Sequence, residues 1–272
     1  MPGVTASEDR STPEKDVVMT DTSTLEVTAE ASDVACFIDG IQSSVTLAWR
    51  ESRPVSLQYA GAGAQKNGHL LGAREEMILV CADADADWVR ENAPDGLQVV
   101  SVEGETPYEV TTNVANMLPG MRERMERELC DAMLASTTEG LIVCDGSIVG
   151  RINNDRIVGV VKTTRSRYLN DESILWKLPR GWRSPRFVIP AGVAGPTARH
   201  SCYVRLHDAR RMPWDFALIR LEAFQSDVLE GLCAMVLEDA QDGSRVDARW
   251  DRHLRSVRAC EDLMRSRRPS IF

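Results

Sequence analysis

The sequence predicts an α/β fold in which a mixed sheet is flanked by helices. Three observations support this prediction: three consecutive β-prone runs after residue 33, a long amphipathic helical segment behind them, and an apolar strand after that helix. The chain has 272 residues, 43% of them hydrophobic. This length suits one large domain or two small ones, with a core filled mainly by aliphatic side chains.

The first half of the chain predicts a meander followed by a helix and a strand. The runs VACFIDG, SVTLAWRES and PVSLQYAG are separated by polar or proline-containing turns, a pattern typical of antiparallel strands. We expect AGAGAQKNG to be a loop, and its glycines lack the spacing of a phosphate-binding P-loop. EMILVCA and LQVVSV predict two strands around a short helix. From about residue 110 to 136, apolar residues recur at every fourth position and predict a helix, with LIVCDGS as the next strand.

The second half of the chain adds strands and helices to this core. RIVGVVKT, SCYVRLHD and FALIRLEAF predict strands, while SILWKL, SDVLEGLCAMVLED and DARWDRHLRSVRACEDLMRSRR predict helices. A meander followed by helix and strand suits a ribonuclease-H-like core, which is the fold class that we predict. Residues 1–30 are rich in Ser, Thr, Asp and Glu and predict a disordered tail, followed by one domain over residues 31–272.

Charge is distributed unevenly along the chain. The net charge is −9, but residues 1–145 carry 10 Lys and Arg against 26 Asp and Glu, whereas residues 146–272 carry 22 against 15. Such asymmetry favours a basic binding face, although arginines that merely solvate helices remain an alternative. The densest basic stretch, with Trp176 and Trp182 interleaved, contains Lys162, Arg165, Arg167, Lys177, Arg180, Arg183 and Arg186. Basic residues neutralise nucleic-acid phosphates and aromatic rings stack on bases. We expect Trp176 to be a core residue and Trp182 to serve function or an interface.

Cysteine usage and hydropathy indicate the compartment. Seven cysteines without a CxxC pair predict neither a disulfide framework nor a zinc site. Cys36, Cys81, Cys144 and Cys202 lie in apolar runs and are expected to be reduced core residues. No apolar run approaches the roughly 20 residues that span a bilayer, and the N-terminal segment lacks the regions of a secretory signal. We therefore expect a soluble, cytoplasmic protein.

Two apolar runs end in the same dipeptide, Asp39-Gly40 after VACFI and Asp145-Gly146 after GLIVC. A carboxylate in a buried strand is costly unless it is paired or binds a cation. If the two strands are neighbours, the aspartates would favour a hard divalent ion such as Mg²⁺ or Mn²⁺. An Asp-Gly pair at the end of a strand is also a common turn signal, and this alternative stays open.

A third carboxylate is expected from the helix that precedes Asp145. Glu128 lies beside the apolar stripe and is expected to point inward, whereas Glu123 and Glu126 are expected on the solvated face. Three such carboxylates could hold two ions that activate water and stabilise the leaving oxygen in phosphodiester hydrolysis.

The sequence resembles the NurA family of DNA-repair nucleases. The resemblance rests on FIDGIQSS, RELCDAMLASTTEGLIVCDGSIVG, RIVGVVKT, SCYVRLHD followed by LIRLEA, and ARWDRHLRSVRACEDLM, in the family's order over most of residues 33–265. It implies a ribonuclease-H-like fold related to Argonaute PIWI domains and a manganese-dependent DNA exonuclease and endonuclease. It also implies a homodimer docked on a hexameric HerA-type ATPase that translocates DNA during end resection.

The family's acidic motifs fall on Asp39, Glu128 and Asp145. The resemblance also implies that Lys162, in the GVVK motif, binds a phosphate at the site.

Further residues near the site follow from the YVRL motif, which contributes Tyr203 and Arg205. The sequence departs from the family in one respect, because a late Gly-Tyr-Pro segment followed by Ala-His is missing. His207 and His253 are candidates for the histidine, and an exposed helical position is the alternative for His253.

Three functions follow from these observations. The first is a metal-dependent DNA nuclease with Asp39, Glu128 and Asp145 as ligands, and Lys162, Arg165, Arg167, Arg183 and Arg205 as contacts to DNA. The second is a non-catalytic subunit that guides DNA on a translocase. The third is an actin-like nucleotide-binding protein, which would need a second glycine-rich hairpin that RINNDRIVG does not supply.

Overall fold

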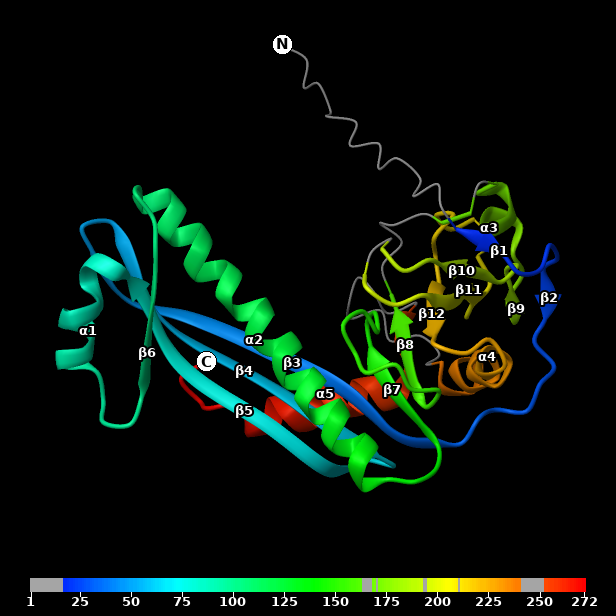
Figure 1. Ribbon diagram of the computed structural model, residues 1–272, viewed down its shortest axis with the longest axis horizontal. Coiled ribbons are helices and arrows are strands. Elements are labelled where there is room, and N and C mark those ends of the chain that lie inside the picture. Colours follow the sequence, from blue (N-terminus) through cyan, green and yellow to red (C-terminus); the bar gives the residue numbers. More distant parts are fainter. Residues whose placement is uncertain (1–16, 163–167, 170, 193–194, 210, 241–251) are drawn as a thin grey trace, which may run out of the picture. The chain divides into compact units, whose positions relative to one another are not determined.

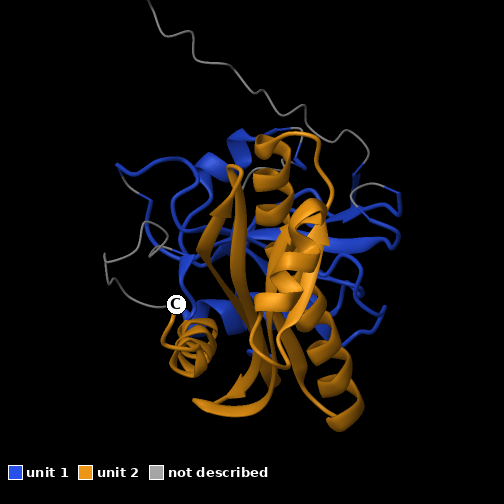
Figure 2. Ribbon diagram, turned by 90° about the vertical axis from the view of Figure 1, so that its left-hand side faces the viewer, with its two compact units in different colours: residues 1–32, 146–254 blue, residues 33–145, 255–272 orange. Residues whose placement is uncertain are grey.

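The computed structural model describes residues 17–162, 168–169, 171–192, 195–209, 211–240 and 252–272. Contacts divide the chain into two compact units, shown in Figure 2: unit 1 contains residues 1–32 and 146–254, and unit 2 contains residues 33–145 and 255–272. The predicted α/β class is confirmed, since each unit combines strands of a sheet with helices. The expectation of a single domain over residues 31–272 stays a prediction.

Unit 2 contains a mixed sheet in the order β7-β3-β4-β5-β6. Strands β3 (Val34–Arg50), β4 (Arg53–Lys66) and β5 (His69–Ala82) form an antiparallel meander, visible in Figure 1 as three long strands. Strand β6 (Gln98–Val102) runs parallel to β5, and β7 (Leu141–Asp145) runs parallel to β3. A meander, a helix and a parallel strand thus follow one another in unit 2, while the ribonuclease-H-like class stays a prediction.

The first two helices of unit 2 follow the predicted positions, whereas the C-terminal helix begins later than the predicted run that starts at residue 247, of which residues 247–251 lie outside the described residues. A 3-10 turn (Asp83–Asp85) and α1 (Ala86–Asn92) lie between β5 and β6. Helix α2 (Pro107–Ser136) begins three residues before the predicted start, because Thr106 and Glu109 form a reciprocal capping box at its N-terminus. Helix α5 (Arg255–Arg267) forms the C-terminal helix.

Helices α2 and α5 pack on opposite faces of the meander. A Cβ on Gly63 of β4 would lie 2.7 Å from Met264 Sδ of α5, whereas a Cβ on Gly72 of β5 would lie 3.3 Å from Leu129 Cδ1 of α2. Gly63 pairs with Ala73, the neighbour of Gly72, and successive residues of a strand point to opposite faces. The small residues of β4 therefore make room for α5.

Two strand predictions are wrong in the same way. VACFIDG and SVTLAWR form one strand, β3, and AGAGAQK is the second half of β4 instead of a loop. Its glycines and alanines, which resemble a loop in sequence, are needed for close packing under α5. The turn comes later, at Asn67 and Gly68, which have φ values of 52° and 77°.

Replacing Gly120 with alanine is expected to stabilise the protein by about 0.5–1 kcal/mol in urea unfolding. Gly120 lies inside α2, and a Cβ there would meet no atom within 4 Å. Gly68 is the matched control, because a Cβ there also meets nothing but its φ is +77°. Gly68→Ala should destabilise the protein by about 1 kcal/mol. Equal effects of both substitutions would contradict this interpretation.

Unit 1 is built on an antiparallel sheet in the order β1-β10-β11-β12-β8, with β9 joining β2 to β11. The elements are β1 (Val18–Met19), β2 (Leu25–Glu26), β8 (Ile157–Val161), α3 (Ser173–Lys177), β9 (Trp182–Arg183), β10 (Phe187–Ile189), β11 (Arg199–Arg205), β12 (Leu218–Ala223) and α4 (Val228–Asp239).

Part of the segment predicted to be a disordered tail is ordered. Residues 18–19 pair with β10 and residues 25–26 pair with β9. Between them, Asp21 Oδ2 lies 3.1 Å from Arg183 Nη1 and 2.9 Å from Arg186 Nε. Polar composition alone misses this segment because backbone pairing and the ion pairs of Asp21 attach it, with Val17 packed against the core of unit 1. Residues 1–16 lie outside the described residues.

The cysteine prediction is confirmed, because all seven cysteines are buried and unbridged. Within the described parts of the chain, no helix combines the length and the apolar character required to cross a bilayer.

Candidate functional site

The two Asp-Gly strands are neighbours. In the parallel pairing of β3 with β7, Ile38 lies opposite Cys144, and the next residue of each strand is Asp39 and Asp145, respectively. Neighbouring strands lie about 4.8 Å apart, so the two aspartates stand side by side at the end of β7. Asp39 is also paired with Gly63 of β4, whose side-chain position faces α5, which places Asp39 on the α5 face of the sheet.

A buried thiol, that of Cys260, lies close to both aspartates. Cys260 of α5 donates to the backbone oxygen of Gly63 with an Sγ–O distance of 3.1 Å. Burial, with smaller contributions from the carboxylates of Asp39 and Asp145, raises the pKa of this thiol to about 12. The thiol is therefore protonated at neutral pH.

Asp39 is held in a fixed orientation. Its side chain is only 6% exposed, and Oδ1 accepts a hydrogen bond of 2.7 Å from the backbone N–H of Gly40. Hydrogen bonding to the carboxylate favours its charged form. Asp145 on the neighbouring strand is half-buried, and two carboxyl groups in such a position favour a cation beside them.

The helix glutamate that faces the sheet is Glu126, and the prediction that Glu128 points inward is wrong. Glu126 is buried, and a Cβ on Gly40 would lie 2.5 Å from its Oε1. Its Oε1 lies 3.2 Å from Arg122 Nη1. Glu128 has a side chain that is 54% exposed and lies 3.8 Å from Arg124. The missing side chain of Gly40 provides the space for Glu126 on the α2 face of the sheet, the face opposite to that of Asp39.

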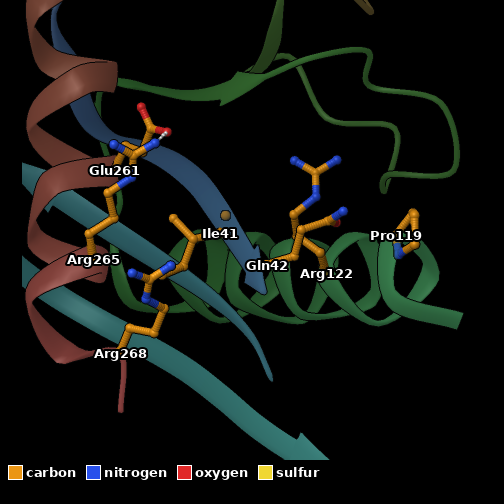
Figure 3. Close-up of a pocket in the computed structure, with 8 residues that line it drawn as sticks. Ile41, Gln42, Pro119, Arg122, Glu261, Arg265 and Arg268 are labelled. Atoms are coloured by element: carbon orange, nitrogen blue, oxygen red, sulfur yellow. Dashed lines mark hydrogen bonds and ion pairs between the residues drawn. The ribbon is translucent and has the colours of Figure 1, made fainter. Parts of the chain in front are cut away.

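A pocket of about 640 Å³ opens beside Gly40. The pairing of β3 with β7 ends at Ile38 and Cys144, whereas β3 continues to Arg50. Strand β3 therefore extends well beyond the end of β7. Figure 3 shows Arg122 reaching in from α2, Arg265 and Arg268 from the α5 side, and Ile41 and Gln42 of β3 between them. Asp39 and the first lining residue of the basic pocket, Gly40, are therefore adjacent positions of β3.

The donor set fits a hard divalent cation. Mn²⁺ and Mg²⁺ prefer carboxylate oxygens, and Asp39 and Asp145 supply two from adjacent strands. Among the described residues there is no group of three or more His, Cys, Asp or Glu side chains arranged to hold a metal ion. Glu126 approaches from the α2 face and is bound to Arg122, so its participation would require exchange of that ion pair.

Comparison with family models finds no match, and no curated protein matches the chain. The chain is similar to the crystal structure of the NurA nuclease from Sulfolobus solfataricus. The TM-score is 0.49 and the sequence identity 9%, over 81% of this chain and 77% of that chain.

Two of the arginines predicted to contact DNA are structural residues of unit 1. Arg183 is 1% exposed and its Nη2 lies 2.6 Å from Glu230 Oε1. Arg205 is fully buried and donates to four backbone carbonyl oxygens. Neither guanidinium can reach a phosphate, so these two assignments are wrong. Lys162 is half-buried at the end of β8, and Arg165 and Arg167 lie outside the described residues.

The other candidates from the sequence also belong to unit 1. Tyr203 is 1% exposed and lies in the core beside Phe187, with ring centroids 5.8 Å apart, and burial raises the pKa of its phenol to about 12. His207 is 8% exposed and follows β11. His253 is half-buried just before α5. Tyr203 therefore acts in packing, while the roles of the two histidines stay predictions.

The expectations for the two tryptophans are reversed. Trp176 is 57% exposed on α3, whereas Trp182 packs against the apolar core around Phe187 and Tyr203. The alternation in ILWKL does not reveal this, because α3 is only five residues long and buries a single side chain, Leu175.

A buried glutamate, missed in the sequence, holds the loop that begins after Asp145. Glu222 of β12 is fully buried, and its Oε2 accepts hydrogen bonds from Ser147 Oγ at 2.7 Å and from the backbone N–H of Ile148 at 3.1 Å. Arg220 Nη2 lies 2.9 Å from Oε1. Ser147 therefore has a structural role, which its position after an Asp-Gly turn does not indicate.

Proposed function

We propose that this protein is a metal-dependent DNA nuclease that hydrolyses phosphodiester bonds. The observation that carries the proposal is that Asp39 and Asp145 directly follow Ile38 and Cys144, the last paired residues of β3 and β7. The arginine pocket next to Gly40 supports it, because a nuclease must hold phosphates beside its metal ligands.

The proposed roles follow from the positions of the side chains. Asp39 and Asp145 hold a divalent ion, which would supply a Lewis acid and an activated water when bound. Glu126 exchanges Arg122 for the ion and completes the ligand set. Gly40 leaves room for the side chains of Glu126 and Arg122 to pack directly over β3. Lys162 is retained as a proposed contact to phosphate.

The proposal also covers the metal ion, the substrate and the partners of the protein. We propose Mn²⁺ or Mg²⁺, in a two-ion arrangement, with DNA as the substrate. The sequence resemblance to NurA supports a homodimer that acts with a hexameric HerA-type ATPase in the cytoplasm. Degradation of linear DNA by the purified protein in Mn²⁺, and its loss in EDTA, would test the activity directly.

A non-catalytic subunit that guides DNA is the second candidate. The observation that favours it is the ion pair between Arg122 and Glu126, which already places a cation at the third carboxylate. Calorimetric titration with Mn²⁺ distinguishes the two, because a non-catalytic subunit should show no carboxylate-dependent binding of metal.

Glu126→Gln is expected to lower Mn²⁺-dependent cleavage by on the order of a hundredfold, because it removes one charged ligand. Glu128→Gln is the matched control on the same helix, with its side chain in solvent, and should retain activity within about twofold. Steady-state cleavage of labelled linear DNA measures both. If Glu128→Gln lost activity and Glu126→Gln kept it, the result would contradict the assignment of Glu126 and support Glu128, the metal ligand predicted from the sequence.

A further inference from the structure

We propose that the pocket beside Gly40 binds the backbone phosphates of a single nucleic-acid strand and leads that strand to Asp39 and Asp145. That the nucleic-acid strand leads to a site of phosphodiester hydrolysis at Asp39 and Asp145 rests on the proposed function. Phosphate binding itself requires only the pocket.

The lining of the pocket matches an anionic ligand. Arg122, Arg265 and Arg268 contribute three guanidinium groups, and Glu261 is the one carboxylate among the lining residues. The pocket therefore carries an excess of positive charge. Guanidinium groups recognise phosphate through paired N–H donors.

Each guanidinium is anchored and still has donors for a ligand. Arg265 Nη2 lies 2.6 Å from Glu261 Oε1, and Arg268 Nη1 donates to Ser43 Oγ at 2.8 Å. Arg122 Nη1 is paired with Glu126. A guanidinium carries five N–H donors, so these contacts orient the three groups without using all their donors. Pre-oriented donors bind with a smaller loss of side-chain entropy.

The basic character of this pocket contrasts with the rest of unit 2. Residues 255–272 carry five arginines against two acidic residues, whereas residues 33–145 carry 8 Lys and Arg against 19 Asp and Glu. Anions are therefore attracted to one place within an otherwise acidic unit, and a polyanion is guided along β3 toward the metal ligands.

The dimensions favour one strand. The pocket has a volume of about 640 Å³ and opens along Gly40, Ile41 and Gln42 of β3. It can admit a nucleotide and its flanking phosphates but not the body of a duplex. Ile41 and Pro119 supply apolar surface for a sugar or base, as Figure 3 shows on either side of Arg122. The substrate class is therefore an unpaired strand or an unwound DNA end.

The experiment measures binding of fluorescein-labelled oligothymidylate to the full chain in EDTA by fluorescence anisotropy, over a series of salt concentrations. The pocket variant carries Arg265→Gln and Arg268→Gln. The matched control carries Arg258→Gln and Arg267→Gln on the same helix. These two arginines pair with Asp262 and Glu75 and do not line the pocket.

We expect the pocket variant to bind on the order of tenfold more weakly and to lower the salt dependence by one to two phosphate contacts. The control should bind within about twofold of the wild type. Equal weakening in both variants, or unchanged binding in the pocket variant, overturns the proposal. Displacement of the oligonucleotide by thymidine monophosphate at equal phosphate concentration assigns the pocket to free nucleotides and also overturns it.

The same assay separates this inference from the proposed function. Asp39→Asn leaves the pocket intact and should bind the oligonucleotide in EDTA as the wild type does. A wild-type protein that binds the strand through the pocket but never cleaves it contradicts the nuclease proposal alone. A protein that cleaves DNA and is unaffected by the pocket substitutions contradicts the pocket alone.

Discussion

Replacing Asp39 or Asp145 with asparagine is expected to lower Mn²⁺-dependent cleavage of linear DNA by on the order of a thousandfold, since each substitution removes a charged ligand worth several kcal/mol in the transition state. The substitutions should not unfold the protein. In EDTA the two carboxylates repel each other at adjacent positions of β3 and β7. Each variant should therefore be as stable as the wild type or more stable.

Metal-dependent stability gives a second measurement of the same site. Mn²⁺ should raise the melting temperature of the wild type, because a ligand that binds only the folded state stabilises it. It should have no such effect on Asp39→Asn or Asp145→Asn. Asp131→Asn, an exposed position on α2, is the control for loss of one charge and should retain both activity and the response to Mn²⁺. Full cleavage by either active-site variant would contradict the assignment.

Arg205→Met is expected to destabilise the protein by about 3–5 kcal/mol, because it breaks a buried network. The guanidinium is fully buried and bridges three segments of unit 1 through the carbonyl oxygens of Leu175 at 2.6 Å, Leu178 at 3.3 Å, Trp214 at 2.9 Å, and Phe216. Methionine fills part of the volume but donates no hydrogen bond to these buried oxygens.

Urea unfolding of the full chain measures this effect. Arg180→Met removes the same charge from an exposed position between α3 and β9 and should change stability by less than about 0.5 kcal/mol. If Arg205→Met kept its stability and lost only affinity for DNA, the result would support the contact between Arg205 and DNA that was predicted from the sequence.

Several features could be predicted from the sequence because they depend on local chemistry. Apolar runs ending in Asp-Gly identified Asp39 and Asp145, since a carboxylate at the end of a buried strand is unusual. The register of β3 and β7 then brought them together. The periodicity of methionines and leucines identified α2, although the capping box that sets its start was missed.

The basic residues show the limit of such reasoning. The density of Lys and Arg in the sequence indicated residues 162–186 as a DNA-binding stretch, and the YVRL motif added Arg205. In the structure, Arg183 and Arg205 are buried within unit 1, where they donate hydrogen bonds. The arginines of the pocket are far apart in sequence, with Arg122 on α2 and Arg265 and Arg268 at the C-terminal end of α5. No local pattern joins them.

The sequence by itself determined the α/β class, the two strand aspartates and the helix that carries a third carboxylate. Only the tertiary structure decided between Glu126 and Glu128. Helical periodicity places Glu128 nearer than Glu126 to the apolar stripe of α2, so the pattern alone favours the residue that the structure leaves exposed. Glu126 is buried because its flank packs over Gly40, the one position of β3 beside Asp39 without a side chain.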